Sequence, residues 1–154
     1  RFNETPDANI ADRMAKSCLI LPSTGGDLEV VRKLTDRAVM LGAYNIDLPY
    51  FQLTKGLAEY RQGRYASALE WIKRVLPPDL GKVPFLDAEA YIVLAMVHYQ
   101  VNQPDEARVA LARGSKIADR LPKPDNGDIG RDWPDWLIVQ LLLREAKLLV
   151  KDAP

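Results

Sequence analysis

Apolar side chains recur every three to four residues along most of this chain, which is the spacing of one face of an α-helix. For example, Leu34, Ala38 and Leu41 follow one another at helical steps after Asp27, a residue type that caps helix N-termini. This spacing, together with the breaks at Pro and Gly, predicts seven helices, at about 5–21, 27–42, 49–62, 65–76, 86–101, 104–120 and 132–151. We therefore expect an all-α protein.

Two segments of the chain repeat each other at a fixed spacing. The step from Gly56 to Ala95 has the same length as the step from Ala68 to Ala107. Each copy is an apolar helical run, a short turn, and a second helix with a small residue on its inner face. Because one helical hairpin cannot bury its apolar face alone, such hairpins stack.

The predicted arrangement is a single domain over 1–154, an α-α superhelix closed by a C-terminal cap. Its hairpins span about 5–42, 49–76 and 86–120, and the capping helix spans about 132–151. The segment 86–101 is apolar almost all round, which is typical of a helix covered on more than one side. Trp133 and Trp136 are interpreted as part of the apolar underside of the cap, with a ligand-stacking platform or an interface anchor as the alternatives.

The segment 55–76 resembles a tetratricopeptide repeat, a helix-turn-helix unit. Gly56 and Ala95 stand where the family has the small residue of its first helix, and Ala68 and Ala107 where it has the alanine of its second. A large side chain at these crossings would hold the helices apart. The spacing of the copies, which is longer than the family's period, and the weaker match of the N-terminal hairpin depart from the family pattern.

The whole chain is similar to the C-terminal regions of large bacterial multidomain serine/threonine kinases, including the segments Cys18–Pro22, Lys55–Arg61 and Asp132–Ile138. That resemblance implies a non-catalytic tail that recruits partners or regulates the kinase. Since the chain begins with Arg1 rather than Met, we expect it to be a fragment of a longer protein. We expect a cytoplasmic location, with the extracytoplasmic part of a membrane-bound kinase as the alternative.

The charge and composition of the chain argue against several classes of function. The 21 basic residues balance the 21 acidic ones, so the chain lacks the basic excess that nucleic-acid binding or contact with an anionic membrane requires. One cysteine and one histidine exclude an internal disulfide and a Cys/His metal cluster. No glycine-rich loop, His-Arg-Asp or Asp-Phe-Gly motif of a kinase is present, and we expect neither enzymatic activity nor a cofactor.

The tetratricopeptide resemblance implies a concave groove lined by the first helix of each hairpin. The matching positions are apolar or aromatic apart from one arginine, and comprise Leu53, Leu57, Tyr60, Arg61, Ile92, Met96 and Tyr99. Such a groove would accept an amphipathic helix or peptide of a partner protein. The carboxylate-gripping set of the related chaperone-binding domains is not expected, since only Lys16 matches it while Ile20, Thr54, Glu89 and Val93 do not.

The predicted function is protein-protein interaction with a partner of unknown identity. The alternative is a structural or oligomerisation module, in which the groove is filled by the protein's own helices. Sedimentation at two concentrations separates these hypotheses, because only self-association makes the mass rise with concentration.

Overall fold

The computed structural model describes residues 5–22, 27–76, 83–123 and 133–151. These residues form seven α-helices packed as adjacent antiparallel pairs and no strand, which confirms the all-α prediction. The chain divides into two compact units, Arg1–Val75 and Leu76–Pro154. The prediction of a single domain stays a prediction.

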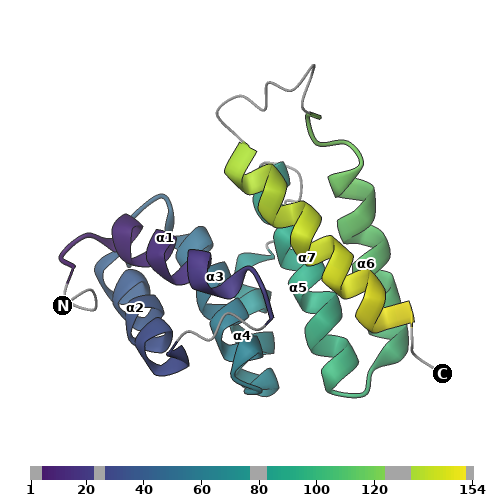
Figure 1. Cartoon of the computed structure of the whole chain (residues 1–154), viewed down its shortest axis with the longest axis horizontal. Coiled ribbons are helices and arrows are strands. Elements are labelled where there is room, and N and C mark those ends of the chain that lie inside the picture. The colour runs from purple at the N-terminus through teal and green to yellow at the C-terminus, as the bar shows by residue number, and fades with distance from the viewer. Residues whose placement is uncertain (1–4, 23–26, 77–82, 124–132, 152–154) are drawn as a thin grey trace. The chain divides into compact units, whose positions relative to one another are not determined.

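The first unit holds two hairpins, α1 (Ala8–Leu19) with α2 (Leu28–Leu41) and α3 (Leu48–Arg61) with α4 (Tyr65–Val75) (Figure 1). Helix α3 also packs on α1 and α2, so it lies at the centre of this unit. Asp7 and Asp27 begin the first two helices, because the carboxylate of each accepts hydrogen bonds from backbone N–H groups that lack a helical partner.

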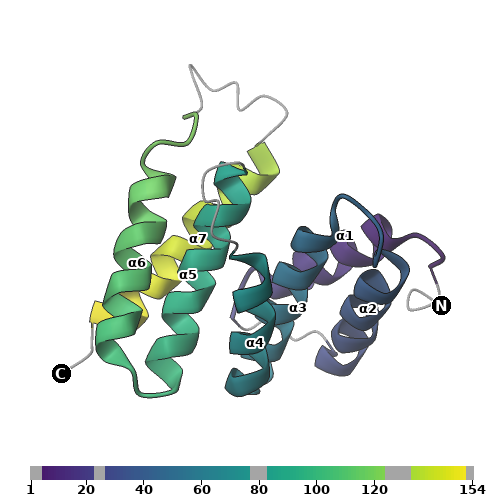
Figure 2. The same cartoon turned by 180° about the vertical axis from the view of Figure 1, so that it is seen from behind.

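The second unit holds the hairpin of α5 (Pro84–Gln100) and α6 (Pro104–Ala118), together with α7 (Trp133–Lys151). Figure 2 shows α5 and α6 as neighbouring antiparallel helices. Both α6 and α7 pack on α5, which is buried on nearly every side from Leu86 to Val97. This burial confirms the prediction that the most apolar helix is covered on more than one side.

The turns of the two central hairpins have the same backbone conformation at positions related by the sequence repeat. Gly63 has a φ of 73° and Asn102 a φ of 59°, both in the left-handed region that ends many helices. After each residue, the next backbone N–H returns to a carbonyl five residues earlier, from Arg64 to Glu59 and from Gln103 to His98, at 2.9 Å in both cases. The sequence repeat is therefore also a structural repeat.

Small residues allow the helices of each hairpin to approach closely. A Cβ atom added to Gly56 would lie 2.5 Å from Cδ1 of Ile72, so α3 and α4 cross where the sequence predicted. In the second unit, a Cβ on Gly114 would lie 2.9 Å from Cγ1 of Ile92. Real side chains do not tolerate such contacts, and the glycines fix the spacing of these pairs.

The buried face of α7 differs from the predicted one. Its core-facing residues include Ile138, Val139, Leu142, Ala146 and Val150, whereas Trp133 is 49% exposed and Trp136 is only partly buried. The interpretation of Trp133 as part of the underside of the cap was wrong. Because apolar residues lie on two faces of this helix, helical spacing alone did not determine which face packs on α5 and α6. Residue 132, the predicted start, lies outside the described residues.

Candidate functional site

The seven predicted groove residues lie on α3 of the first unit and α5 of the second. Five of them are buried, namely Leu53, Leu57, Tyr60, Ile92 and Met96, and the other two, Arg61 and Tyr99, are partly exposed. Nothing in the structure of either unit tests whether the two sets line one groove, so this assignment stays a prediction. A partner would reach the five buried side chains only after their surroundings move.

Arg61 connects α3 to the end of α1. Its Nε donates a hydrogen bond to the backbone carbonyl of Leu19 at 3.0 Å, and its Nη2 donates to that of Ile20 at 3.4 Å. The last carbonyls of a helix have no helical partner and carry its negative dipole end, so a guanidinium stabilises them in two ways. The contacts support a structural role for Arg61, which the sequence could not reveal because the partners lie on a different helix, far away along the chain.

A network of charged side chains joins α2, α3 and the turn before α4. The ammonium of Lys55 lies 2.7 Å from Oδ1 of Asp36 and 2.7 Å from Oε1 of Glu59, and Arg64 Nη2 lies 2.9 Å from the same Oε1. Lys55 and Glu59 are both buried. Arg32 extends the network on α2, with its Nη1 2.8 Å from Asp36 Oδ2.

These contacts keep Glu59 ionised. Burial works against its charged form, but hydrogen bonds from Arg64 and Lys55 outweigh burial and lower its pKa from 4.5 to about 2. In the second unit the equivalent positions hold His98 and Gln103, with Nδ1 2.7 Å from Oε1. The side-chain contact across the turn thus recurs without a carboxylate.

Asp12 is the other perturbed carboxyl group in the core of the first unit. Burial raises its pKa, and this effect exceeds the opposing influence of Lys16 and of a hydrogen bond from Thr54. Its Oδ1 has no hydrogen-bond partner. Among the residues that the structure describes, no three His, Cys, Asp or Glu side chains gather where they could hold a metal ion.

A turn between α2 and α3 exposes large apolar side chains that sequence reasoning missed. Tyr44 is fully exposed, Ile46 is 92% exposed, and Met40 in the last turn of α2 is 66% exposed. We call these three residues the turn surface. The available signal was the placement of tyrosine and isoleucine in the short connection between α2 and α3, outside the helical spacing of apolar residues.

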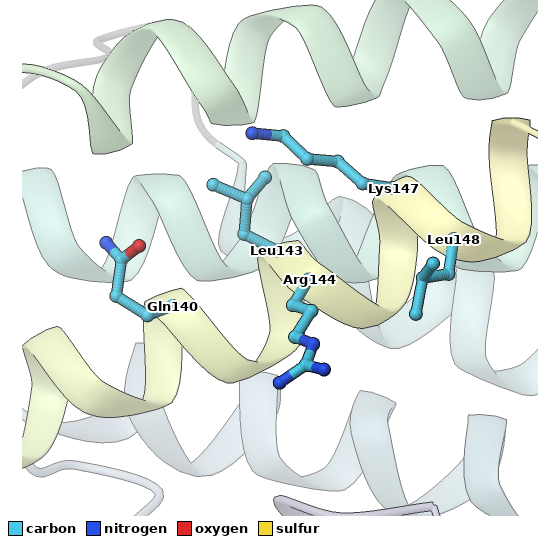
Figure 3. A pocket seen from close by; sticks show the side chains of 5 residues that line it. All are labelled: Gln140, Leu143, Arg144, Lys147 and Leu148. Carbon is cyan, nitrogen blue, oxygen red and sulfur yellow. The ribbon is translucent and has the colours of Figure 1, made fainter.

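Helix α7 carries the second exposed apolar surface. Trp133, Leu137 and Leu148 are 49%, 39% and 61% exposed. A shallow depression of about 250 Å³ lies on the same helix, lined by Gln140, Leu143, Arg144, Lys147 and Leu148 (Figure 3). In that view Arg144 and Leu148 extend to one side of the helix and Leu143 and Lys147 to the other.

Comparisons of the chain with protein-family models, with curated proteins and with solved structures gave no match. Within the part of the chain that the structure describes, no helix is both long enough and apolar enough to cross a bilayer. Any assignment of function therefore rests on the surfaces and contacts above.

Proposed function

We propose that this chain is a non-catalytic protein-interaction module of stacked helical hairpins, similar to tetratricopeptide domains. The observation that carries the proposal is the turn surface of Met40, Tyr44 and Ile46. Large apolar side chains exposed to water lower solubility, and apolar surface exposed in this way is what interaction sites use. Tyrosine is among the residues that contribute most to binding energy at protein interfaces.

The backbone of this turn is ordered by hydrogen bonds before any partner binds. Asn45 N–H donates to the Gly42 carbonyl at 2.9 Å, and Leu48 N–H donates to the Asn45 carbonyl at 3.1 Å. The Asn45 side chain in turn accepts from Asp47 N–H at 3.0 Å. A preorganised turn loses little conformational entropy on binding, which favours docking of Tyr44 and Ile46 into an apolar pocket of a partner protein.

The turn surface can be altered without touching the core. By contrast, Tyr60 of the predicted groove is buried, so its truncation would remove core packing and confuse loss of binding with loss of fold. The turn surface therefore gives the sharper test of the interaction function.

That test places the photo-crosslinking amino acid p-benzoylphenylalanine at position 44, in the cells that make the protein. We expect a discrete cross-linked partner that disappears when Ile46→Ser is added. The matched control carries the probe in place of Val109, which is 59% exposed on α6. Equal cross-linking at positions 44 and 109, no cross-link at 44, or no effect of Ile46→Ser would refute the proposal.

The resemblance to bacterial kinase tails supports a narrower proposal, in which this module recruits partners for a serine/threonine kinase in the same polypeptide. The intact mass of the native polypeptide, with peptide sequencing, tests it. We expect a chain several times heavier than 17.3 kDa that includes a kinase glycine-rich loop. A native chain close to 17.3 kDa would leave a free-standing adaptor instead.

A further inference from the structure

The outer face of α7 has the spacing of a helix-packing seam. Trp133, Leu137, Gln140, Arg144 and Lys147 follow one another at alternating steps of four and three residues, the heptad spacing of coiled coils. We call these five residues the α7 seam. They lie opposite the face that packs on α5 and α6; Gln140 is partly exposed and the other four are exposed.

The depression of Figure 3 has the layout of a hole that receives a side chain from a facing helix. Gln140, Leu143, Arg144 and Lys147 occupy positions i, i+3, i+4 and i+7, the four positions that form such a hole in knobs-into-holes packing. Its centre lies between residues 143 and 144, three to four residues after Gln140. Leu137 lies three residues before Gln140 and is 39% exposed.

Leu137 can act as the side chain that inserts into such a hole. Leu137 and the centre of the hole lie at nearly equal distances along the helix from Gln140, on opposite sides of it. In two antiparallel copies of α7 related by a two-fold axis at Gln140, Leu137 of each copy faces the hole of the other. A contact in which the same patch serves both sides is the isologous type that closes a symmetric dimer. We infer that two copies of this chain associate through antiparallel α7 helices centred on Gln140.

Charge favours this orientation over a parallel one. Arg144 and Lys147 are exposed and give the C-terminal half of the seam a positive charge. A parallel pair would place these cations beside their equivalents. The antiparallel pair separates them and brings Lys147 to the indole face of Trp133 of the partner subunit, an attractive cation–π arrangement.

The inferred contact goes beyond the proposed docking at the turn surface and uses a different unit of the chain. Sedimentation equilibrium of the full chain, from about 10 µM to about 1 mM, tests it over the range expected for weak association. We expect the mass to rise from 17.3 kDa toward twice that value. A mass that stays at 17.3 kDa over the whole range overturns the inference while leaving the cross-linking test at Tyr44 unaffected.

Opposite charges at position 137 distinguish the orientations. In the antiparallel dimer, Leu137→Lys meets Arg144 and Lys147 of the partner subunit and should weaken association by about tenfold or more. Leu137→Glu meets the same cations and should associate at least about ten times more tightly than Leu137→Lys. In a parallel dimer, residue 137 of one subunit faces residue 137 of the other, so equal weakening by both substitutions contradicts the inferred orientation. If Leu137→Lys does not weaken association, the contact between subunits lies elsewhere and the inference is overturned.

A symmetric disulfide locates the two-fold axis. In a Cys18→Ser background, Gln140→Cys should form covalent dimers under mild oxidation, because the two residues face each other across the axis. Val109→Cys, exposed on α6, is the matched control and should remain monomeric. Equal yields of covalent dimer from the two variants would overturn the placement of the two-fold axis at Gln140. Circular dichroism verifies that each variant is folded.

Discussion

Replacing Glu59 by glutamine should destabilise the first unit strongly for a single polar substitution. The change keeps the side chain's shape but removes the charge that holds Lys55 and Arg64. Lys55 is buried and would keep the ionic contact with Asp36 alone. Breaking a buried ion pair is costly, because the remaining charge stays removed from water without full compensation.

The pKa of Glu59 gives the magnitude. Its decrease from 4.5 to about 2 corresponds to about 3 kcal/mol, at about 1.4 kcal/mol per pKa unit. Because the Arg64 side chain is 42% exposed, solvent screens part of this interaction, and we expect a loss of about 2 kcal/mol at pH 7.

The loss should depend on pH in a defined direction. A carboxyl group with a lower pKa in the folded state stabilises the protein above its unfolded-state pKa, here 4.5, and this contribution disappears as the pH falls toward about 2. The difference in unfolding free energy between wild type and Glu59→Gln should therefore shrink by more than half between pH 7 and pH 3.

Urea unfolding monitored by Trp71 fluorescence measures this difference, since Trp71 is the tryptophan of the first unit. Trp133→Phe and Trp136→Phe remove the other two tryptophans of the chain. Glu70→Gln is the matched control, because Glu70 and Lys73 are 3.9 Å apart with side chains 70% and 59% exposed. That pair should contribute less than about 0.5 kcal/mol. An equally small loss for Glu59→Gln at pH 7, or a loss unchanged at pH 3, would refute the reasoning.

Four further substitutions test other contacts by urea unfolding. Arg61→Met keeps the aliphatic stem but removes the hydrogen bonds to the end of α1, and should cost about 1–2 kcal/mol; unchanged stability would contradict the capping role. Gly63→Ala should cost about 1 kcal/mol because alanine disfavours positive φ, whereas Asn102→Gly, which is compatible with the same φ, should change stability by less than about 0.5 kcal/mol. Asp12→Asn should stabilise the protein at pH 7, because burial raises the pKa of Asp12 and thereby penalises its ionised form. This gain in stability should vanish as the pH falls and Asp12 becomes protonated. A gain that does not change with pH would contradict this explanation.

Local sequence signals were sufficient for the helices and their crossings. Asp27 caps α2 through its own neighbours, and Pro104 begins α6 where its missing N–H costs nothing. Gly56 indicated a close approach of helices, and a Cβ atom there would lie 2.5 Å from Cδ1 of Ile72. Each of these features depends on residues close in sequence or on a repeat that the sequence displays.

The candidate site was less predictable because it depends on long-range packing. Arg61 was expected in a groove, but its guanidinium contacts the carbonyls of Leu19 and Ile20, two helices earlier in the chain. Helix α7 has apolar residues on two faces, and only packing against α5 and α6 determines that Trp133 remains exposed. The exposure of Tyr44 and Ile46 likewise follows from the path of the turn, which periodicity does not specify.

The two equivalent turns imply that acid affects the two units unequally. The contact across the first turn needs an ionised Glu59, and Asp36 adds a second carboxylate to the same network. The contact across the second turn joins an imidazole to the amide of Gln103, which does not lose a charge in acid. As the pH falls from 4.5 toward 2, Arg1–Val75 should therefore lose more stability than Leu76–Pro154, and urea should then unfold the chain in two steps with the first unit unfolding first.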